Sequence, residues 1–145
     1  MTYQQNRFSS FFEFFKFMIA FRKQHTVIHK KLPDSVCGMD PIHTHNVNAD
    51  KTDIPRDART FCVSFAGYDR EKGKDDLVYI AVNSYWEDVS ITLPDLHKRG
   101  FWYLSVNTYG DGQGRYFYPQ GQEIRITGNF IMRPRSVAIF TGRPY

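Results

Sequence analysis

The chain of 145 residues is 41% hydrophobic and 23% charged, and it carries a formal net charge of +4. That composition is ordinary for a globular domain, and the length suits one domain or a small domain with an appendage. Lysine and arginine are scattered among acidic residues without any block of like charge, which argues against a nucleic-acid partner.

The first predicted element is a helix over residues 8–24. Ser10 followed by Glu13 has the spacing of a capping box, in which the two side chains bond exposed N–H groups at a helix start. Arg22 and Lys23 lie at the far end, where the helix dipole favours cations. One broad apolar face contains Phe8, Phe11, Phe12, Phe15, Met18 and Ile19, and the other side carries Phe14, Phe17 and Phe21.

This distribution of apolar side chains is unusual for a surface helix. A surface helix normally has one apolar stripe, whereas a helix that is apolar nearly all round is buried against several partners. One small sheet offers one partner, so we expect the helix to need neighbours that the chain does not supply. We assign the packing on a further domain, or on a second copy of the chain, to Phe11, Phe12, Phe14, Phe15, Met18 and Phe21.

The sequence also bears on location. Residues 1–7 have no secretory pattern, and Glu13 and Lys16 interrupt an apolar run that is shorter than the roughly 20 residues that span a bilayer. We therefore expect no targeting or membrane segment in this sequence, and no membrane partner. Cys37 and Cys62 are too few for a disulfide framework and suit reduced thiols, so we expect a cytoplasmic protein.

Residues 26–59 are predicted to form a long irregular connection. Pro33, Pro41 and Pro55 interrupt it, and the apolar periodicity disappears. A connection of this length should carry short elements of its own or wrap along a surface. A short strand over 27–32 is one such element.

The remainder of the chain is predicted to be β structure. Residues 77–83 are almost uniformly apolar, which is typical of a central strand covered on both faces, and 89–93 alternate strictly. We read these two segments as a β-hairpin. Further strands are predicted at 61–65, 101–106, 124–126 and 136–141. Five or six short strands after one helix indicate an all-β fold, an antiparallel β-sandwich or partial barrel preceded by one N-terminal α-helix.

Three groups of residues contain side chains of the kinds used in metal binding, phosphate binding or catalysis. His25, His29, His43, His45 and Cys37 could supply zinc ligands, but no established zinc spacing supports them, and polar histidines in a loop are favoured. The glycine-rich run from Gly110 to Gly114 lacks the context of a phosphate loop. Glu87 and Asp88 are adjacent on an extended segment and point apart, so they cannot flank a glycosidic bond together. We therefore expect no catalytic, metal or cofactor residues.

The aromatic residues of the second half leave two alternatives. Flat aromatic rings can bind the apolar face of a sugar, and Tyr85, Trp86, Tyr109, Tyr116 and Tyr118 are the candidates for contact with a glucan. The favoured alternative is that Trp102 belongs to the core and that the tyrosines from 109 to 118 fasten a long loop.

Three segments resemble a known family. The run Asp76-Leu-Val-Tyr-Ile-Ala-Val-Asn-Ser-Tyr-Trp-Glu-Asp-Val-Ser-Ile-Thr-Leu-Pro94 resembles the C-terminal domain of isoamylase and glycogen-debranching enzymes of the α-amylase superfamily. The helix with its ending at Arg22, Lys23 and His25 resembles the last helix of the (β/α)8 barrel in those enzymes. Pro134-Arg-Ser-Val137 is similar to the family's closing pattern. The resemblance spans about residues 7–141, with the loops at 33–57 and 107–122 matching weakly.

The resemblance implies a division of the chain and a function. Residues 1–32 would be the terminal barrel helix with its connector, and residues 33–145 a C-terminal β-sandwich domain. A barrel needs about 250 residues, and the family's catalytic carboxylates lie on barrel strands upstream, so none is carried over to this chain. The implied role is non-catalytic, in a parent glycoside hydrolase that cleaves α-1,6 branches of glycogen-like glucans.

Two other functions stay open beside this one. The chain could be a free-standing carbohydrate-binding module that uses its exposed aromatics. It could also be an interaction module, in which case we expect the isolated chain to self-associate through residues 8–21.

Overall fold

The computed structural model describes residues 3–49, 53–96 and 100–144. The helical elements are α1 (Tyr3–Gln24) and the short 3-10 helix η1 (Thr26–Ile28). The strands are β1 (Ile42–His45), β2 (Thr60–Asp69), β3 (Lys74–Asn83), β4 (Val89–Ile91), β5 (Gly100–Asn107), β6 (Ile124–Ile126), β7 (Phe130–Met132) and β8 (Ser136–Pro144). The chain is therefore mostly antiparallel β structure with one long helix, as the sequence predicts.

Six strands form one antiparallel sheet in the order β1-β2-β3-β8-β5-β6, and β4 pairs with β7 in a separate two-stranded sheet. β3 lies between β2 and β8, and Leu77, Val78 and Tyr79 are at most 2% exposed. The prediction of a central strand is confirmed. β3 is apolar on both sides because it has neighbouring strands at both edges and packed layers on both faces.

The predicted hairpin between 77–83 and 89–93 is wrong. β3 pairs with β2 and β8, whereas β4 pairs with β7. The chain leaves the large sheet at Asn83, whose amide Nδ2 donates to the carbonyls of Glu87 at 3.0 Å and Arg133 at 3.2 Å. These bonds hold a turn that carries the chain to the second sheet instead of returning it along β3.

Two predictions about the N-terminal segment are also corrected. α1 begins at Tyr3 and runs through Ser10, so Ser10 and Glu13 do not form a capping box at its start. No glycine or proline stands between residues 3 and 9, and nothing in that stretch ends the helix. Residues 27–32 contain the 3-10 turn η1 and no strand.

Other boundaries differ in smaller ways. The connection 26–59 carries β1, as its length predicts, while β7 is not anticipated because Phe-Ile-Met has no alternation. The register of β5 against β8 shifts between Leu104 and Val106. Because of this bulge, Leu104 and Val106 pack on opposite faces of the sheet, although they are two residues apart. Among the described residues, no helix is long and apolar enough to cross a bilayer.

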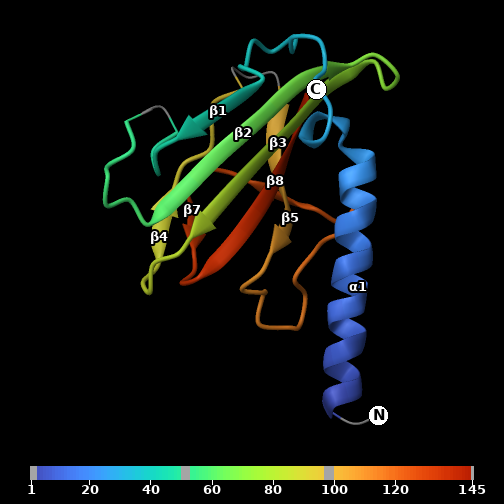
Figure 1. The fold of residues 1–145 in the computed structure, drawn as a ribbon, viewed down its shortest axis with the longest axis vertical. Coiled ribbons are helices and arrows are strands. Elements are labelled where there is room, and N and C mark those ends of the chain that lie inside the picture. Colours follow the sequence, from blue (N-terminus) through green and yellow to red (C-terminus); the bar gives the residue numbers. More distant parts are fainter. Residues whose placement is uncertain (1–2, 50–52, 97–99, 145) are drawn as a thin grey trace.

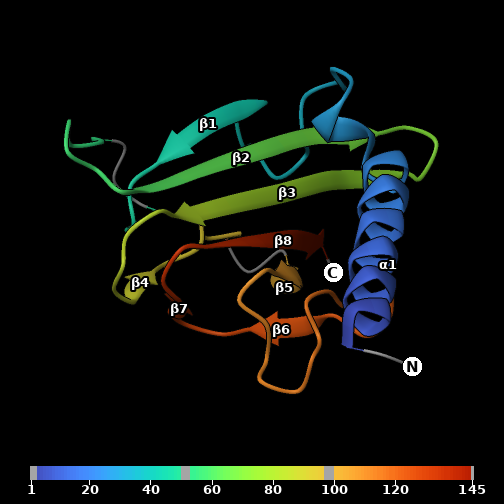
Figure 2. The ribbon, with the colours of Figure 1, turned by 60° about the horizontal axis from the view of Figure 1, so that its bottom comes forward.

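Two apolar clusters cover the two faces of the large sheet. One cluster joins the sheet to β4 and β7, with Tyr79, Trp102, Phe140, Ile91 and Met132 at its centre. The other joins the opposite face to α1, through Val78, Val106, Ile139 and the inner side of the helix. Figure 2 shows α1 at one end of the long strands and β4 at the other. The end of the sheet that carries β4 therefore has no helix over its second face.

Candidate functional site

The face of the large sheet that α1 partly covers is mostly apolar over β1, β2, β3 and β8. Residues opposite each other in antiparallel strands point to the same side, and the register includes three consecutive rows on this face that are apolar except for two threonines. The rows are Ile42, Phe65, Val78 and Thr141; Thr44, Val63, Ile80 and Ile139; and Phe61, Val82 and Val137. We call the part of these rows that lies away from α1 the open face: Ile42, Thr44, Phe61, Val63, Phe65, Ile80, Val82 and Val137.

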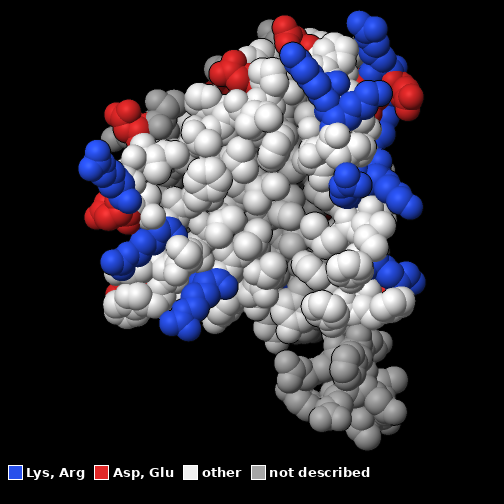
Figure 3. All heavy atoms as spheres, in the orientation of Figure 1, with Lys and Arg blue, Asp and Glu red and all other residues white. Residues whose placement is uncertain are grey.

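The open face is only half covered by the chain itself. Ile42 is 66% exposed and Phe61 46% exposed. The other apolar residues of the open face are half-buried: Val63, Phe65, Ile80, Val82 and Val137. In Figure 3 the middle of this side of the molecule is without charged residues, and lysine, arginine, aspartate and glutamate lie around its margin. An apolar centre with a charged rim is the usual anatomy of a surface that another protein covers.

α1 has an inner side that packs on the sheet. Phe14, Phe17, Met18 and Phe21 contact the cluster around Val78, and the ring of Phe17 stacks on Phe117 with centroids 4.6 Å apart. Three of the six residues predicted to pack on a missing neighbour, Phe14, Met18 and Phe21, therefore find their neighbours within the chain.

The outer side of α1 is exposed. Phe11, Phe12 and Phe15 are 68%, 60% and 56% exposed, and Ile19 is 45% exposed. The rings of Phe11 and Phe15 stack on each other with centroids 6.4 Å apart. The side chain of Phe8, predicted for the same face, lies outside the described part. Four apolar residues on one side of the helix thus contact solvent in the isolated chain. Phe11, Phe12 and Phe15 are among the six predicted to pack on a missing neighbour, and Ile19 is a further exposed residue.

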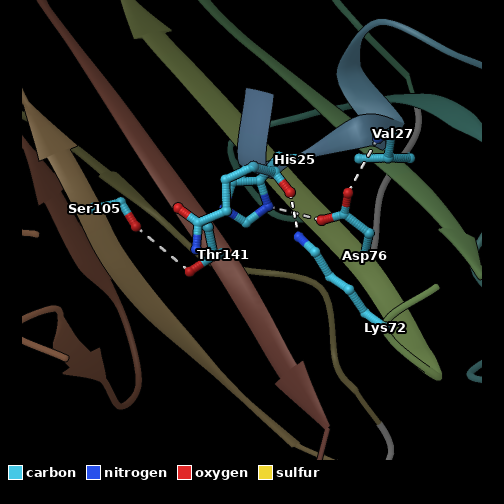
Figure 4. Close-up of polar contacts among 7 residues, drawn as sticks. His25, Val27, Lys72, Asp76, Ser105 and Thr141 are labelled. Atoms are coloured by element: carbon cyan, nitrogen blue, oxygen red, sulfur yellow. Dashed lines mark hydrogen bonds and ion pairs between the residues drawn. The ribbon is translucent and has the colours of Figure 1, made fainter. Parts of the chain in front are cut away.

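The end of α1 is fastened to β3 by a polar junction, drawn in Figure 4. His25 Nδ1 lies 2.7 Å from Asp76 Oδ1, and the other oxygen of that carboxylate accepts the Val27 N–H at 3.0 Å. The Lys72 ammonium donates to the carbonyl of Gln24, the last residue of the helix. The junction fixes the direction in which α1 leaves the sheet and thereby fixes where its outer side points.

Three buried carboxylates near this junction serve the backbone. Asp75 accepts the N–H groups of Val36 at 2.8 Å and Cys37 at 2.9 Å, and Asp69 accepts those of Glu71 and Lys72. With Asp76 they line a polar hollow of about 60 Å³. Because these carboxylates accept backbone N–H groups, they hold loops in place and are not a pair arranged for acid–base chemistry.

The histidines are used as hydrogen-bonding groups. His45 is buried, with Nε2 2.8 Å from Ser64 Oγ and Nδ1 3.2 Å from the Ala49 carbonyl. Burial lowers the pKa of His45 below its ordinary value. The hydrogen bond to the Ala49 carbonyl acts in the opposite direction, but its effect is smaller. His29 is exposed, and His25 is bound to Asp76. Within the ranges that the structure describes, no group of three or more histidine, cysteine or acidic side chains is placed to hold a metal.

The glycine-rich run and the adjacent carboxylates also have local partners. Asp111 Oδ1 accepts the N–H groups of Gln113 and Arg115, and its Oδ2 accepts from the Arg115 guanidinium at 2.8 Å. These contacts lower the pKa of Asp111, and the hydrogen bond from the Gln113 N–H has the largest effect. Asp88 forms an ion pair with Arg133 at 2.9 Å. The loop thus folds around its own carboxylate, and Asp88 is tied to β7–β8 instead of facing Glu87.

The five tyrosines and tryptophans proposed for glucan contact fall into different environments. Trp86 is 62% exposed, Tyr109 51% and Tyr116 40%, and Tyr85 is half-buried. Tyr118 is 3% exposed and belongs to the core beside Trp102, so its ring has no free face, and its inclusion among the candidates is wrong. The indole N–H of Trp102 donates to the Pro94 carbonyl, as expected for a core tryptophan.

The structure brings two further residues to this group that sequence reasoning missed. The Arg59 guanidinium lies over the Tyr85 ring, 4.8 Å from its centroid, and Arg133 lies over Tyr109 at 5.1 Å. Both arginines are distant in sequence from the rings they cover, so no spacing rule signals them. Comparison of the chain with known protein families and with curated proteins finds no match.

Proposed function

We propose that this chain is the non-catalytic C-terminal β-domain, with an attached helix, of an α-glucan debranching glycoside hydrolase, and that it docks on a (β/α)8 barrel. The observation that carries the proposal is the exposed outer side of α1, with Phe11, Phe12, Phe15 and Ile19, together with the open face of the sheet. The resemblance of residues 76–94 to isoamylase-type domains supplies the identity of the partner.

The docking surface would have two parts. The outer side of α1 would pack as one helix of the barrel, and the open face would lie against neighbouring barrel elements. Complete burial of a large apolar side chain contributes about 1.5–3 kcal/mol to the free energy of association. Each exposed residue of the two surfaces would contribute the part of that energy that corresponds to its exposed fraction; these residues are Phe11, Phe12, Phe15, Ile42 and Phe61. In this proposal the two-stranded sheet of β4 and β7 completes a β-sandwich with the large sheet.

The parent enzyme would supply the chemistry. Hydrolysis of an α-1,6 branch needs two carboxylates that flank the scissile bond, and these would stand on the barrel. Within this chain, Asp69, Asp75, Asp76 and Asp88 are engaged by backbone amides or by Arg133. The free thiols of Cys37 and Cys62 suit the cytoplasmic location expected for an enzyme of glycogen breakdown.

The test has a genetic and a biochemical arm. The reading frame upstream of codon 1 is expected to encode a barrel, and a frame that opens at Met1 without one would refute the proposal. The chain is then co-expressed with that barrel, and release of reducing ends from glycogen is measured. Activity is expected with the wild-type chain and is expected to be lost with Phe15→Ser and Phe61→Ser combined. Hydrolysis by the purified chain alone would contradict a non-catalytic role.

A second function is favoured by the same helix when no barrel is present: self-association. Two copies of α1 placed antiparallel about a two-fold axis at Phe15 bring Phe11 of one copy against Ile19 of the other. The exposed parts of Phe11, Phe12 and Phe15 amount to about two whole side chains of 150–250 Å² each. That area is below the roughly 1,200 Å² of a stable interface, so the dimer is expected to be weak.

Light scattering over a range of concentrations tests this association. The wild-type chain is expected to approach the dimer mass as concentration rises, and Phe15→Ser is expected to stay monomeric. Ile19→Lys is a second variant, because it places a charge against Phe11 of the other copy. A monomeric mass at every concentration would refute self-association through α1.

A further inference from the structure

The turn between β3 and β4, residues 84–88, is held by a dense set of hydrogen bonds. Asn83 is 1% exposed, and its Oδ1 accepts the Tyr85 N–H at 3.0 Å, while its Nδ2 donates to the carbonyls of Glu87 and Arg133. The backbone N–H and the hydroxyl of Ser84 both donate to the Arg59 carbonyl. A turn that is bonded in this way presents its remaining side chains in one fixed arrangement.

The large apolar side chain that this turn leaves to solvent is an indole. Trp86 is 62% exposed, and its ring lies beside the half-buried Tyr85, with centroids 5.5 Å apart and the planes inclined by 60°. The Arg59 guanidinium covers Tyr85. The rigid turn therefore does not bury Trp86 in the fold, although a tryptophan is the residue whose burial would contribute most. This arrangement is typical of a preorganised contact residue.

The charges around Trp86 indicate what kind of ligand fits. Arg59, Glu87, Asp88 and Arg133 flank the turn, and all four are exposed. With Arg135, whose backbone N–H donates to the Tyr85 carbonyl, three cations and two anions border the turn, so charges of both signs are mixed and no field of one sign selects a charged ligand. It offers a flat apolar ring beside planar groups that donate and accept hydrogen bonds, which is the chemistry that recognises an uncharged polyhydroxylated ring.

We propose that the turn 84–88 is a carbohydrate-contact site in which the Trp86 indole stacks on the C–H face of a pyranose unit of a neutral glucan. Tyr85 supports the indole from one side, and the flanking carboxylates and guanidinium groups bond the sugar hydroxyls. The choice of an α-glucan among neutral sugars rests on the proposed function, whereas the position of the site rests on the geometry of the turn.

The experiment titrates the chain with maltoheptaose. The chain has two tryptophans, and Trp102 is 5% exposed, so a change in tryptophan fluorescence on titration reports Trp86. A saturable change is expected at millimolar sugar, with backbone amide shifts in nuclear magnetic resonance spectra confined to residues 84–88 and their neighbours. Calorimetry of Trp86→Ala is expected to show affinity reduced about tenfold or more. Ile124→Ala is the control, since it removes an exposed apolar side chain on β6 that has no part in the site, and it is expected to bind as the wild type does.

Three other outcomes decide against the site, and a fourth separates it from the proposed function. The absence of a saturable signal at tens of millimolar maltoheptaose overturns it, and so does unchanged affinity in Trp86→Ala. If Trp86→Ala prevents assembly with the barrel while no sugar binds, then Trp86 is a protein contact, and the carbohydrate site is refuted while the proposed function stands. If maltoheptaose binds at Trp86 but no barrel is encoded upstream, the site stands and the proposed function fails.

Discussion

His25 Nδ1 and Asp76 Oδ1 lie 2.7 Å apart, which joins the residue that follows α1 to the beginning of β3, 51 positions further along the sequence. Phe21, one helical turn before His25, packs its ring against the imidazole with centroids 4.3 Å apart. The polar contact is therefore enclosed by an aromatic residue of the helix. The hydrogen bond between His25 and Asp76 is directional and fixes the position of the helix on the sheet. Apolar packing is not directional, and alone it would permit the helix to shift along the sheet.

Replacing Asp76 by alanine is expected to lower the free energy of unfolding by about 2–4 kcal/mol, because the Val27 N–H and the His25 imidazole both lose their buried acceptor. Urea unfolding followed by circular dichroism measures the change. Asp57→Ala, at an exposed position, is the control and is expected to shift the free energy by less than about 0.5 kcal/mol. Equal stability of Asp76→Ala and the wild type would show that the junction does not hold the helix.

The two sides of α1 are expected to respond differently to truncation. Phe17→Ala removes a ring that stacks on Phe117 and should cost about 2–3 kcal/mol of unfolding free energy. Phe15→Ala removes a ring that is 56% exposed and should change the stability of the monomer by about 0.5 kcal/mol or less. Thermal unfolding at low concentration, where association is absent, separates the two. A large loss for Phe15→Ala would mean that the outer side is packed on the chain itself.

The buried imidazole of His45 predicts a pH dependence of stability. Its pKa is lowered from 6.5 by burial, so between that lowered value and pH 6.5 the unfolded chain binds more protons than the folded chain. Stability due to His45 is therefore fully present above pH 6.5 and falls as the pH is reduced below it. Measured against His45→Asn, whose side chain does not titrate, the wild type should lose unfolding free energy faster between pH 7 and pH 5. Parallel curves for the two proteins would contradict the assignment.

The two cysteines should differ in reactivity. Cys62 is fully buried, and burial raises the pKa of its thiol, both of which reduce attack by a thiol reagent, whereas Cys37 is partly exposed. Ellman's reagent at pH 8 is expected to titrate one thiol in the native chain and two in guanidinium chloride. Cys37→Ser should abolish the native reaction. Two fast-reacting thiols in the folded wild type would refute the buried position of Cys62.

Asn83 is predicted to be the residue on which the turn 84–88 depends most. Asn83→Ala removes four hydrogen bonds in a position that is 1% exposed, and a loss of about 2–4 kcal/mol in unfolding free energy is expected. Asn129→Ala, at an exposed position of another turn, is the comparison and should be nearly neutral. Chemical denaturation measures both. Similar stability for the two variants would mean that the turn is held by the backbone alone.

Sequence patterns predict the existence of most elements but not their pairing. The central position of β3 follows from its unbroken apolar run, and both faces are indeed packed. The separation of β4 from β3 does not follow, because it depends on what the Asn83 amide bonds to, and Arg133 is 50 residues away. The exposed side of α1 is predictable because the helix carries more apolar residues than one sheet can cover.

The candidate site divides in the same way. The exposure of Trp86 and the burial of Tyr118 cannot be separated by composition, since both lie in polar-aromatic segments, and only the packing of Tyr118 against the core distinguishes them. The arginine above Tyr85 is equally hidden, because Arg59 reaches that ring through the pairing of β2 with β3. Contacts made across the sheet are set by register, which one residue of slip would change entirely.

The place of β8 in the sheet has a consequence for how the chain acquires its structure during synthesis. β8 is the strand latest in the sequence, yet it lies between β3 and β5, and those two strands do not pair with each other. Until residues 136–144 leave the ribosome, β3 and β5 each expose an unpaired edge, and the ring of Phe140 is missing from between Tyr79 and Phe130. The nascent chain must therefore remain open and prone to wrong edge pairing until its final strand is inserted.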